Sequence, residues 1–479
     1  MNILLVVAPR MPALTMQSTL WLPVSLLYLA AVLREAGHAP TILDLAAVRV
    51  PEGVQPEEHY RTLLLDKIRE LDPGYIGISC RATMDFPQIR QLARVIHEEV
   101  PNTPICLGGA HPTWHCREIL EHCPEIDCIV LGEGEPQVVA LAEAIAAGDR
   151  RAYANIESFA YVDKESGSIM VNPRKSYIQD LDTWPFPAYD LVDFSNYHSN
   201  FSTWHNPKGH QINMRAPILT SRSCPFNCSF CMGHSMSGRG FRPRSPAEVV
   251  RELEFLVREF GQNFFCFYDE NCLLHKDRFI AICDGIYKTG FDIQLSAPVG
   301  FYLNAVDEDI VKAFVRAGGC AVGVPIETGS SYLRNKIIEK KISDDTIKHV
   351  VKLYKKYDLF TYGAFIMGFE EDTPATLDET IAMIHELQLD VNDVFNLVPY
   401  PGTRIHAQAK RNGTLLIDDS QAWKGEVILG SRGGAQQFFI QPPGLSMEEL
   451  RQYRAKFDQL RLYSDRARNL NRQGQKQSR

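Results

Sequence analysis

The chain has 479 residues, of which 45% are hydrophobic and 23% are charged, and its formal net charge at pH 7 is −8. A chain of this length exceeds what one hydrophobic core usually organises, so we expect two or three domains. The negative net charge provides no field that would concentrate nucleic acid, so a nucleic-acid partner is not favoured.

Membrane and export signals are not indicated by the sequence. The longest uncharged apolar run, residues 18–33, contains Pro23 and is shorter than the roughly 20 residues that a spanning helix needs. Residues 1–5 pass directly into a strand-like run without a basic region, so we expect no signal peptide and a cytoplasmic location. Twelve cysteines in a chain of this length suit a reducing compartment better than a disulfide scaffold.

Residues 1–150 alternate short apolar strands with helical patterns, which predicts a doubly wound, Rossmann-like parallel sheet of an α/β domain. Helices are expected at 25–35 and 86–99. Glycine-rich turns follow the later strands, and ligands of such sheets bind beyond the carboxyl ends of the strands. The predicted strands are 3–8, 39–43, 75–79, 104–107 and 128–131.

Residues 151–205 predict a hairpin, with strands at 159–162 and 169–172, followed by a linker rich in proline and aromatic residues. Residues 206–405 then predict six βα units, which suit a partial (β/α) barrel with its active site at the carboxyl ends of the strands. The predicted barrel strands are 216–220, 264–268, 292–296, 320–326, 360–366 and 393–397, and the predicted helices include 246–259, 277–288, 307–317 and 344–357.

Residues 406–479 form a polar extension with one predicted helix at 446–462. The chain finishes in a basic tail rich in glutamine and asparagine, which predicts disorder. No internal repeat and no coiled-coil pattern is visible.

The loop after the first barrel strand carries Cys224, Cys228 and Cys231 as a Cys-x3-Cys-x2-Cys motif. Thiolates are soft ligands suited to iron–sulfur clusters or zinc, and a short loop brings three of them to one point. Three protein ligands would leave one iron of a 4Fe–4S cluster free to chelate the amino and carboxylate groups of S-adenosylmethionine. These three cysteines are therefore the predicted metal-binding and catalytic residues.

Two other interpretations of the motif stay open. His234 lies three residues beyond the last cysteine and would complete a Cys3His zinc site, although small zinc modules do not need a six-unit barrel. Cys266 or Cys272 would supply a fourth cluster ligand, but both suit packing near the second barrel strand.

On this loop the chain resembles the radical S-adenosylmethionine (SAM) superfamily, whose defining motif is Cys-x3-Cys-x2-Cys. The resemblance implies cofactor contacts from five further residues. Phe230 would lie near the adenine, and Asp269 and Glu270 would contact the methionine amino group. Glu327 would touch the ribose or the carboxylate, and Gly368 lies in a turn that passes the adenine. Each acid is alternatively a solvated loop carboxylate.

Residues 1–145 resemble the cobalamin-binding domain that precedes the barrel in one large subgroup of this superfamily. The comparable stretch, residues 44–47, lacks the histidine of the Asp-x-His-x-x-Gly loop that coordinates cobalt in other cobalamin proteins, and some chains keep this domain without binding cobalamin. No Gly-x-Gly-x-x-Gly follows the first strand, so a dinucleotide site is less favoured. The resemblance implies cobalamin contacts from small or polar residues after the strands, which are Ser79, Gly108, Gly109, Gly132, Glu133 and Gly134.

The resemblance implies a cobalamin-dependent radical methylase that acts on an unactivated carbon, or phosphorus, of a small-molecule biosynthetic intermediate. Its cofactors would be a 4Fe–4S cluster, SAM and cobalamin, and its electron donor a flavodoxin or ferredoxin type protein. One alternative is a radical cyclase, dehydratase or rearrangement enzyme, and a second is a non-enzymatic zinc or cobalamin protein. Lipid, tetrapyrrole, peptide and antibiotic precursors all remain open as substrates.

Overall fold

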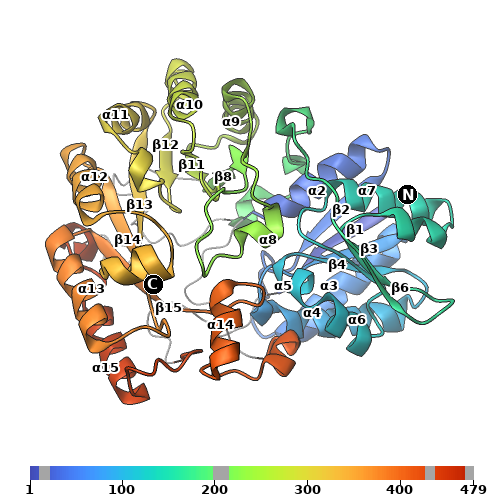
Figure 1. The fold of residues 1–479 in the computed structure, drawn as a ribbon. Helices are drawn as coiled ribbons and strands as arrows, with labels where there is room; N and C mark the ends of the chain where they lie inside the picture. Colours follow the sequence, from blue (N-terminus) through green and yellow to red (C-terminus); the bar gives the residue numbers. More distant parts are fainter. Residues whose placement is uncertain (10–21, 198–214, 427–436, 470–479) are drawn as a thin grey trace.

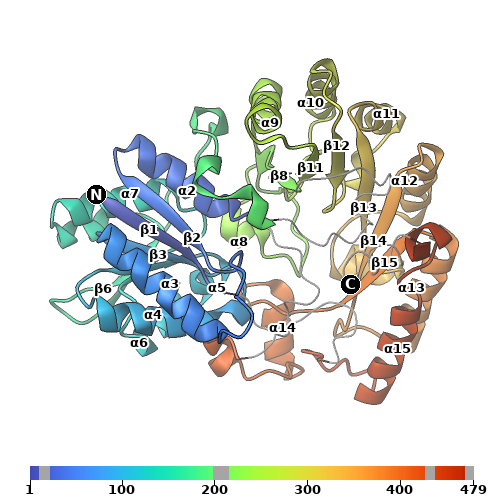
Figure 2. The same cartoon turned by 180° about the vertical axis from the view of Figure 1, so that it is seen from behind.

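The structure, a computed structural model, describes residues 1–9, 22–197, 215–426 and 437–469. Two α/β units, each built around its own sheet, lie side by side in both views (Figures 1 and 2). Three predicted features fall wholly or partly outside the described residues: the apolar run 18–33, the end of the linker 151–205 and the C-terminal tail.

The first unit is the predicted doubly wound sheet, in which β1 to β5 run parallel. The predicted hairpin forms as β6 and β7 and pairs antiparallel with β5, so this sheet continues past residue 150 to Asn172. The strand order is β2-β1-β3-β4-β5-β6-β7. The bounds are β1 Asn2–Val7, β2 Ala39–Asp44, β3 Tyr75–Ser79, β4 Ile105–Gly108, β5 Cys128–Val130, β6 Phe159–Val162 and β7 Ile169–Asn172.

Helices cover both faces of this sheet, which explains why its strands are nearly continuous apolar runs. The helices α2 (Val24–Glu35) and α7 (Glu135–Ala146) pack on one face. The helices α3 (Pro56–Leu71), α4 (Phe86–Glu99) and α6 (Cys116–His122) pack on the other. Both helices predicted here, α2 and α4, are confirmed.

The second unit is the predicted partial barrel, in which six parallel strands stand in the order β8-β11-β12-β13-β14-β15. The strands are β8 Ala216–Ile218, β11 Phe264–Phe267, β12 Gln294–Ala297, β13 Gly319–Glu327, β14 Phe360–Met367 and β15 Val391–Asn396. The helices around them are α9 Pro246–Phe260, α10 Lys276–Lys288, α11 Glu308–Arg316, α12 Asp344–Lys356 and α13 Pro374–Leu387 (Figure 1). A short antiparallel pair, β9 Ser221–Arg222 and β10 Arg242–Pro243, follows β8.

The predicted C-terminal helix forms as α15 (Met447–Gln459) and covers the barrel at its last strand, beyond α14 (Arg404–Asn412). Arg454 of α15 is 1% exposed and donates to the Val394 carbonyl oxygen at 2.5 Å. The main-chain N–H of Asn392 donates to the Arg461 carbonyl oxygen at 2.8 Å. The C-terminal region therefore protects the open edge of the barrel at β15.

The loops at the carboxyl ends of the two sheets contact one another. A Cβ added at Gly132, after β5, would lie 2.8 Å from the carbonyl oxygen of Met236 in the second unit. A Cβ added at Gly402, after β15, would lie 1.9 Å from the ring of Trp114 in the first unit. The two edges at which ligands of parallel sheets bind therefore meet at one interface.

Within the described ranges, no helix combines the length and apolarity that crossing a lipid bilayer requires.

Candidate active site

The three-cysteine loop lies between β9 and α8 (Gly233–Ser237) and is held by neighbouring loops. Ser223 takes a left-handed backbone conformation with φ 70°, and its hydroxyl donates to the Gly238 carbonyl oxygen at 2.7 Å. The N–H of Ser229 donates to the Ile338 carbonyl oxygen at 3.1 Å, and the Ser229 carbonyl oxygen accepts from Ile405 N–H at 3.3 Å. The loop is thus fixed by the segments that follow β13 and β15.

The three thiols share one electrostatic environment. Burial raises the pKa of all three, and that of Cys228 reaches about 11. The charges of Cys224 and Cys231 raise the pKa of Cys228 further. Thiols bind metals as thiolates, so iron would have to displace these protons.

The described residues contain no three His, Cys, Asp or Glu side chains that are grouped closely enough to hold a metal ion as they stand. The three thiols would therefore have to turn towards a shared cluster. The ring Nε2 of His234, the fourth ligand of the zinc alternative, donates to the Phe226 carbonyl oxygen. This contact leaves Nδ1 as the ring nitrogen that would have to bind zinc, so it does not by itself decide between zinc and a cluster.

Asp269 and Glu270, at the end of β11, have different surroundings. Asp269 is buried, and one of its carboxylate oxygens accepts from Thr220 Oγ1 at 2.8 Å and Ser221 Oγ at 2.6 Å. Its other oxygen has no hydrogen-bond partner among the described residues. Glu270 accepts from Ser237 Oγ at 3.1 Å, and its charge raises the pKa of two cluster-loop thiols. A Cβ added at Gly233 would lie 3.4 Å from Glu270 Oε1 and 3.5 Å from Cys231 Sγ, so Glu270 faces the cluster loop, whereas Asp269 holds the strand that leads to it.

Glu327 ends β13 in a left-handed conformation, with φ 69°, beside a shift in the β13–β14 register. Such a conformation is unusual for a residue other than glycine. Its carboxylate forms an ion pair with Lys340, and both side chains are largely buried. The Lys340 ammonium also lowers the pKa of Cys228 and Cys231 through its charge. Sequence reasoning missed Lys340 because no spacing pattern connects it to the cysteines.

The residues predicted to line the adenine also come together. Phe230 packs in one apolar cluster with Ile366 and Phe369, which flank Gly368. Gly368 has φ 94°, and its N–H donates to the buried carboxylate of Asp372 at 2.7 Å. The structure thus brings the cluster loop and the turn after β14 to one place.

In the first unit, Thr113 joins the turns that follow β4 and β5. Its hydroxyl donates to the Gly109 carbonyl oxygen at 2.7 Å and accepts from Gly132 N–H at 2.9 Å. A Cβ on Gly109, which has φ 111°, would lie 2.3 Å from the Cys80 carbonyl oxygen, so only glycine fits there. A Cβ on Gly108 would meet nothing closer than 4.0 Å. The backbone near Gly108 is therefore open to a bulky ligand.

The turn formed by Gly132, Glu133 and Gly134 has a contact that the sequence did not indicate. The Glu133 carboxylate pairs with Arg242 of the second unit, and the backbone of Gly132 lies against Met236. Gly134 precedes α7 as its N-cap residue. This turn joins the two units, and its contact with cobalamin stays a prediction, as does that of Ser79.

The donor set and its surroundings fit the cofactors that the sequence implies. Three thiols on one loop suit a cluster with one open iron. Two buried polar atoms, Ser229 Oγ on the loop and the second carboxylate oxygen of Asp269, lack hydrogen-bond partners among the described residues, as expected of groups that would meet a polar ligand. His111 is buried with both ring nitrogens engaged, by Thr83 and the Trp423 carbonyl oxygen.

Comparison with known proteins identifies both units. Residues 17–142 match the B12 binding domain family, and residues 218–384 match the Radical SAM superfamily. An uncharacterised methyltransferase of Pyrococcus horikoshii is 32% identical over 420 residues, which cover 87% of this chain and 84% of that protein. An anaerobic magnesium-protoporphyrin IX monomethyl ester cyclase of Cereibacter sphaeroides is 28% identical over 435 residues, covering 88% of this chain and 67% of that protein.

A solved structure has the same fold. The radical SAM methyltransferase TsrM from Kitasatospora setae, with cobalamin and a 4Fe–4S cluster bound, superposes with a TM-score of 0.73 at 17% identity, covering 95% of this chain and 90% of that one. The predicted fold class, and the resemblance on which it was partly based, are confirmed. The chain therefore belongs to the radical SAM superfamily, as a member that carries a B12-binding domain ahead of the radical SAM domain.

Proposed function

We propose that this chain is a cobalamin-dependent radical SAM methyltransferase that acts on an unactivated carbon or phosphorus of a small-molecule intermediate. Its family implies a 4Fe–4S cluster, SAM and cobalamin as cofactors. The observation that carries the proposal is the meeting of the two ligand-binding edges, since the turn after β5 contacts α8, directly behind the cysteine loop. A relative named as a methyltransferase, 32% identical along most of both chains, supports the same reaction.

When bound, the cluster with SAM supplies a 5′-deoxyadenosyl radical, and cobalamin supplies a transferable methyl group. Cys224, Cys228 and Cys231 would hold three irons as thiolates. Glu270 would accept hydrogen bonds from the methionine amino group. Lys340, held by Glu327, would offer a cation to the methionine carboxylate.

The apolar cluster around Phe230 and Phe369 would form a wall for the adenine and exclude water from it. Tyr268 and Tyr362 belong to a second apolar cluster with barrel-strand residues such as Cys266 and Ala321. Both clusters lie among buried residues and would help to exclude water from the barrel interior. The protein's part is to orient the reactants and keep them dry.

The electron donor in this proposal is a flavodoxin or ferredoxin type protein, because a radical SAM cluster needs a low-potential reductant. We place the enzyme in the cytoplasm. All twelve cysteines are free thiols in the structure, which supports a reducing location.

The test is to purify the protein without oxygen and to measure iron, sulfide, zinc and corrinoid together. We expect about four irons and four sulfides per chain, with 5′-deoxyadenosine formed from SAM under reduction. Cys224→Ala, Cys228→Ala and Cys231→Ala should each abolish that product. Cys266→Ala, a buried cysteine outside the loop, is the control and should keep it.

Product analysis separates methyl transfer from the other radical chemistries. A methyltransferase makes S-adenosylhomocysteine as well as 5′-deoxyadenosine, whereas a cyclase or rearrangement enzyme makes only the latter from SAM. The cyclase of Cereibacter sphaeroides, at 28% identity, makes this comparison necessary. Zinc in place of iron and sulfide would refute the proposal.

A further inference from the structure

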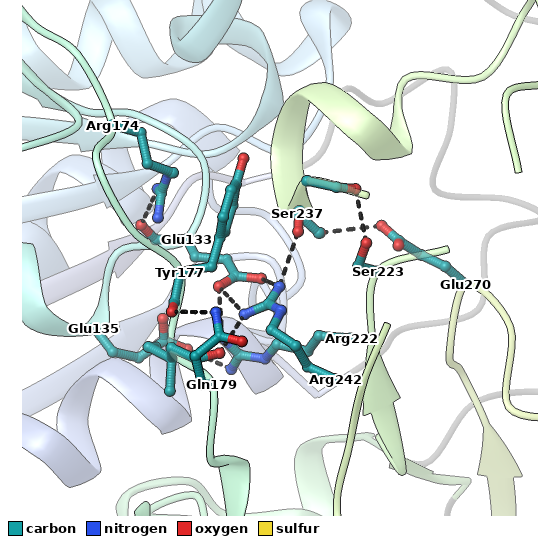
Figure 3. A network of polar contacts seen from close by, with 12 residues as sticks. Glu133, Glu135, Arg174, Tyr177, Gln179, Arg222, Ser223, Ser237, Arg242 and Glu270 are labelled. Carbon is teal, nitrogen blue, oxygen red and sulfur yellow. Dashed lines mark hydrogen bonds and ion pairs between the residues drawn. The ribbon is translucent and has the colours of Figure 1, made fainter. Parts of the chain in front are cut away.

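Four charged side chains meet where the first unit contacts the barrel, and they are nearly buried (Figure 3). Arg242, 3% exposed at its side chain, forms an ion pair with Glu133, whose side chain is 9% exposed. Arg222 forms an ion pair with Glu135 and lies 3.7 Å from the Glu133 carboxylate. The two acids come from the turn after β5 and the start of α7, and the two arginines from β9 and β10. We call these four residues the latch.

The latch is costly to bury unless every charge keeps its partner. Taking a charge out of water carries a large penalty, and removing one member of a buried pair leaves the other uncompensated. Two arginines and two glutamates leave no net charge in this group. An interface that had only to hold two domains together would need no such group, because apolar residues of similar size stabilise as well.

The latch holds the cysteine loop from both sides along the chain. Arg222 stands two residues before Cys224, where the loop begins. On the far side, Arg242 donates to the Ser237 carbonyl oxygen at 2.9 Å, at the end of α8. The loop between these points, with all three cysteines, is therefore fastened at its start and its end to the first unit.

The same contacts lead on to Glu270. Ser237 receives the Arg242 hydrogen bond on its carbonyl oxygen, and its hydroxyl donates to Glu270 at 3.1 Å (Figure 3). A continuous path thus runs from Glu133 in the B12-binding unit, through Arg242 and Ser237, to a carboxylate that faces the cluster thiols.

Residues of the linker between the units also contact Arg242 and Glu133. Arg242 also donates to the Ile178 carbonyl oxygen at 2.9 Å. Arg174 donates to the Glu133 carbonyl oxygen at 2.7 Å. The ring of Tyr177 lies between the two arginines, 4.7 Å from the Arg174 guanidinium and 5.1 Å from that of Arg242. The Arg242 guanidinium is held by at least three elements, which leaves it little freedom to move.

We propose that Glu133 and Arg242 are positioning residues, which set the cluster loop and Glu270 in place relative to the B12-binding unit. This inference rests on the proposed function. Reactants that must meet across two domains need a defined separation, and a misplacement of 1 Å costs on the order of a hundredfold in rate. A buried ion pair with few alternative partners provides that definition better than an apolar contact does, because its geometry is directional.

The test uses the full-length, anaerobically purified protein with Glu133→Gln, which keeps the shape of the side chain and removes its charge. Asp190→Asn is the matched control, because Asp190 forms an exposed ion pair with Arg34 between the linker and the first unit. We expect Glu133→Gln to keep its iron and sulfide. Hydrogen exchange of the α8 amides should rise, and the KM for SAM in 5′-deoxyadenosine formation should rise, both on the order of tenfold.

The role of Glu270 is tested by a double-mutant cycle with Glu270→Gln. If Glu133 acts through Glu270, the double variant should have the KM for SAM of Glu270→Gln alone, because the effects of coupled residues do not add. If Glu133→Gln fails to fold, the neutral pair Glu133→Gln with Arg242→Gln removes the uncompensated charge and is measured in its place.

The inference would be overturned if Glu133→Gln had the same α8 exchange rate and the same KM for SAM as Asp190→Asn. It would also be overturned if the effects of Glu133→Gln and Glu270→Gln on the KM for SAM were fully additive. Failure of the proposed function looks different. In that case the unaltered protein itself would form no 5′-deoxyadenosine, while exchange of α8 would still report whether the latch holds it.

Discussion

Replacing Trp423 with alanine tests how the C-terminal region stabilises the B12-binding unit. Trp423 belongs to the short helix Asp419–Lys424, yet its side chain is 4% exposed within the core of the first unit. Its ring lies edge-on to His122, with centroids 4.8 Å apart, and the Arg90 guanidinium lies 5.8 Å above it. A residue from beyond the barrel thus completes the core of the preceding domain.

The expected cost follows from the buried area. A tryptophan buries about 200 Å², which at about 25 cal/mol per Å² corresponds to about 5 kcal/mol. Truncations of buried tryptophan cost about 3–5 kcal/mol in practice. Because about 1.4 kcal/mol is a factor of ten, hydrogen exchange of the most protected α4 amides should accelerate by a factor of a hundred or more.

The assay is hydrogen exchange measured by mass spectrometry, with peptides from α4 as the reporter and peptides from α10, in the barrel, as the internal reference. Leu416→Ala is the control variant, since Leu416 is 47% exposed and should change neither peptide. Unchanged α4 protection in Trp423→Ala would refute the role of this contact. Equal loss in α4 and α10 would show instead that the whole chain had been destabilised.

Three further changes have defined outcomes. Burial lowers the pKa of His111 to about 3, so its neutral form stabilises the fold above pH 6.5 and this contribution is lost as the pH falls towards 3. Unfolding measured at pH 7.5 and at pH 5 should show that His111→Gln removes about 2 kcal/mol of the difference in stability between these two pH values. Gly402→Ala should lower the unfolding temperature more than Gly413→Ala does, because both glycines have positive φ but only a Cβ at the former would collide with Trp114; equal effects would show that the contact yields. Burial raises the pKa of Asp372 to about 6, so its stabilising contribution is present below pH 3.8 and is lost as the pH rises through 6. Unfolding measured from pH 4 to 8 should show that Asp372→Asn abolishes this pH dependence. Asp372→Ala should destabilise the protein at every pH, because it leaves two main-chain N–H groups without an acceptor.

The elements of this protein were largely predictable because their signals are local. The strand Tyr75–Ser79 was predicted with the bounds that it has, and the helix Phe86–Glu99 likewise, since each carries its own apolar pattern. The cysteine loop was equally predictable, because three ligands within eight residues need no distant partner to be recognised.

The partners of the ion pairs at the site were not predictable. Glu133 was expected to contact cobalamin, but its ion-pair partner Arg242 is 109 residues away. The Glu327 carboxylate was assigned to SAM without its Lys340 partner. The local sequence around an arginine or a lysine has no feature that marks which carboxylate it will meet.

The amino-acid sequence by itself determined the two α/β units, their order and the chemistry of the cluster, because strand and helix periods and the spacing of thiols are properties of short segments. Only the tertiary structure decided that the turn after β5 and the start of α7 form ion pairs with residues on both sides of the cluster loop, and that Trp423 completes the core of the first unit. These contacts depend on how two sheets pack against each other, and packing brings together residues whose separation along the chain carries no information about their distance in space.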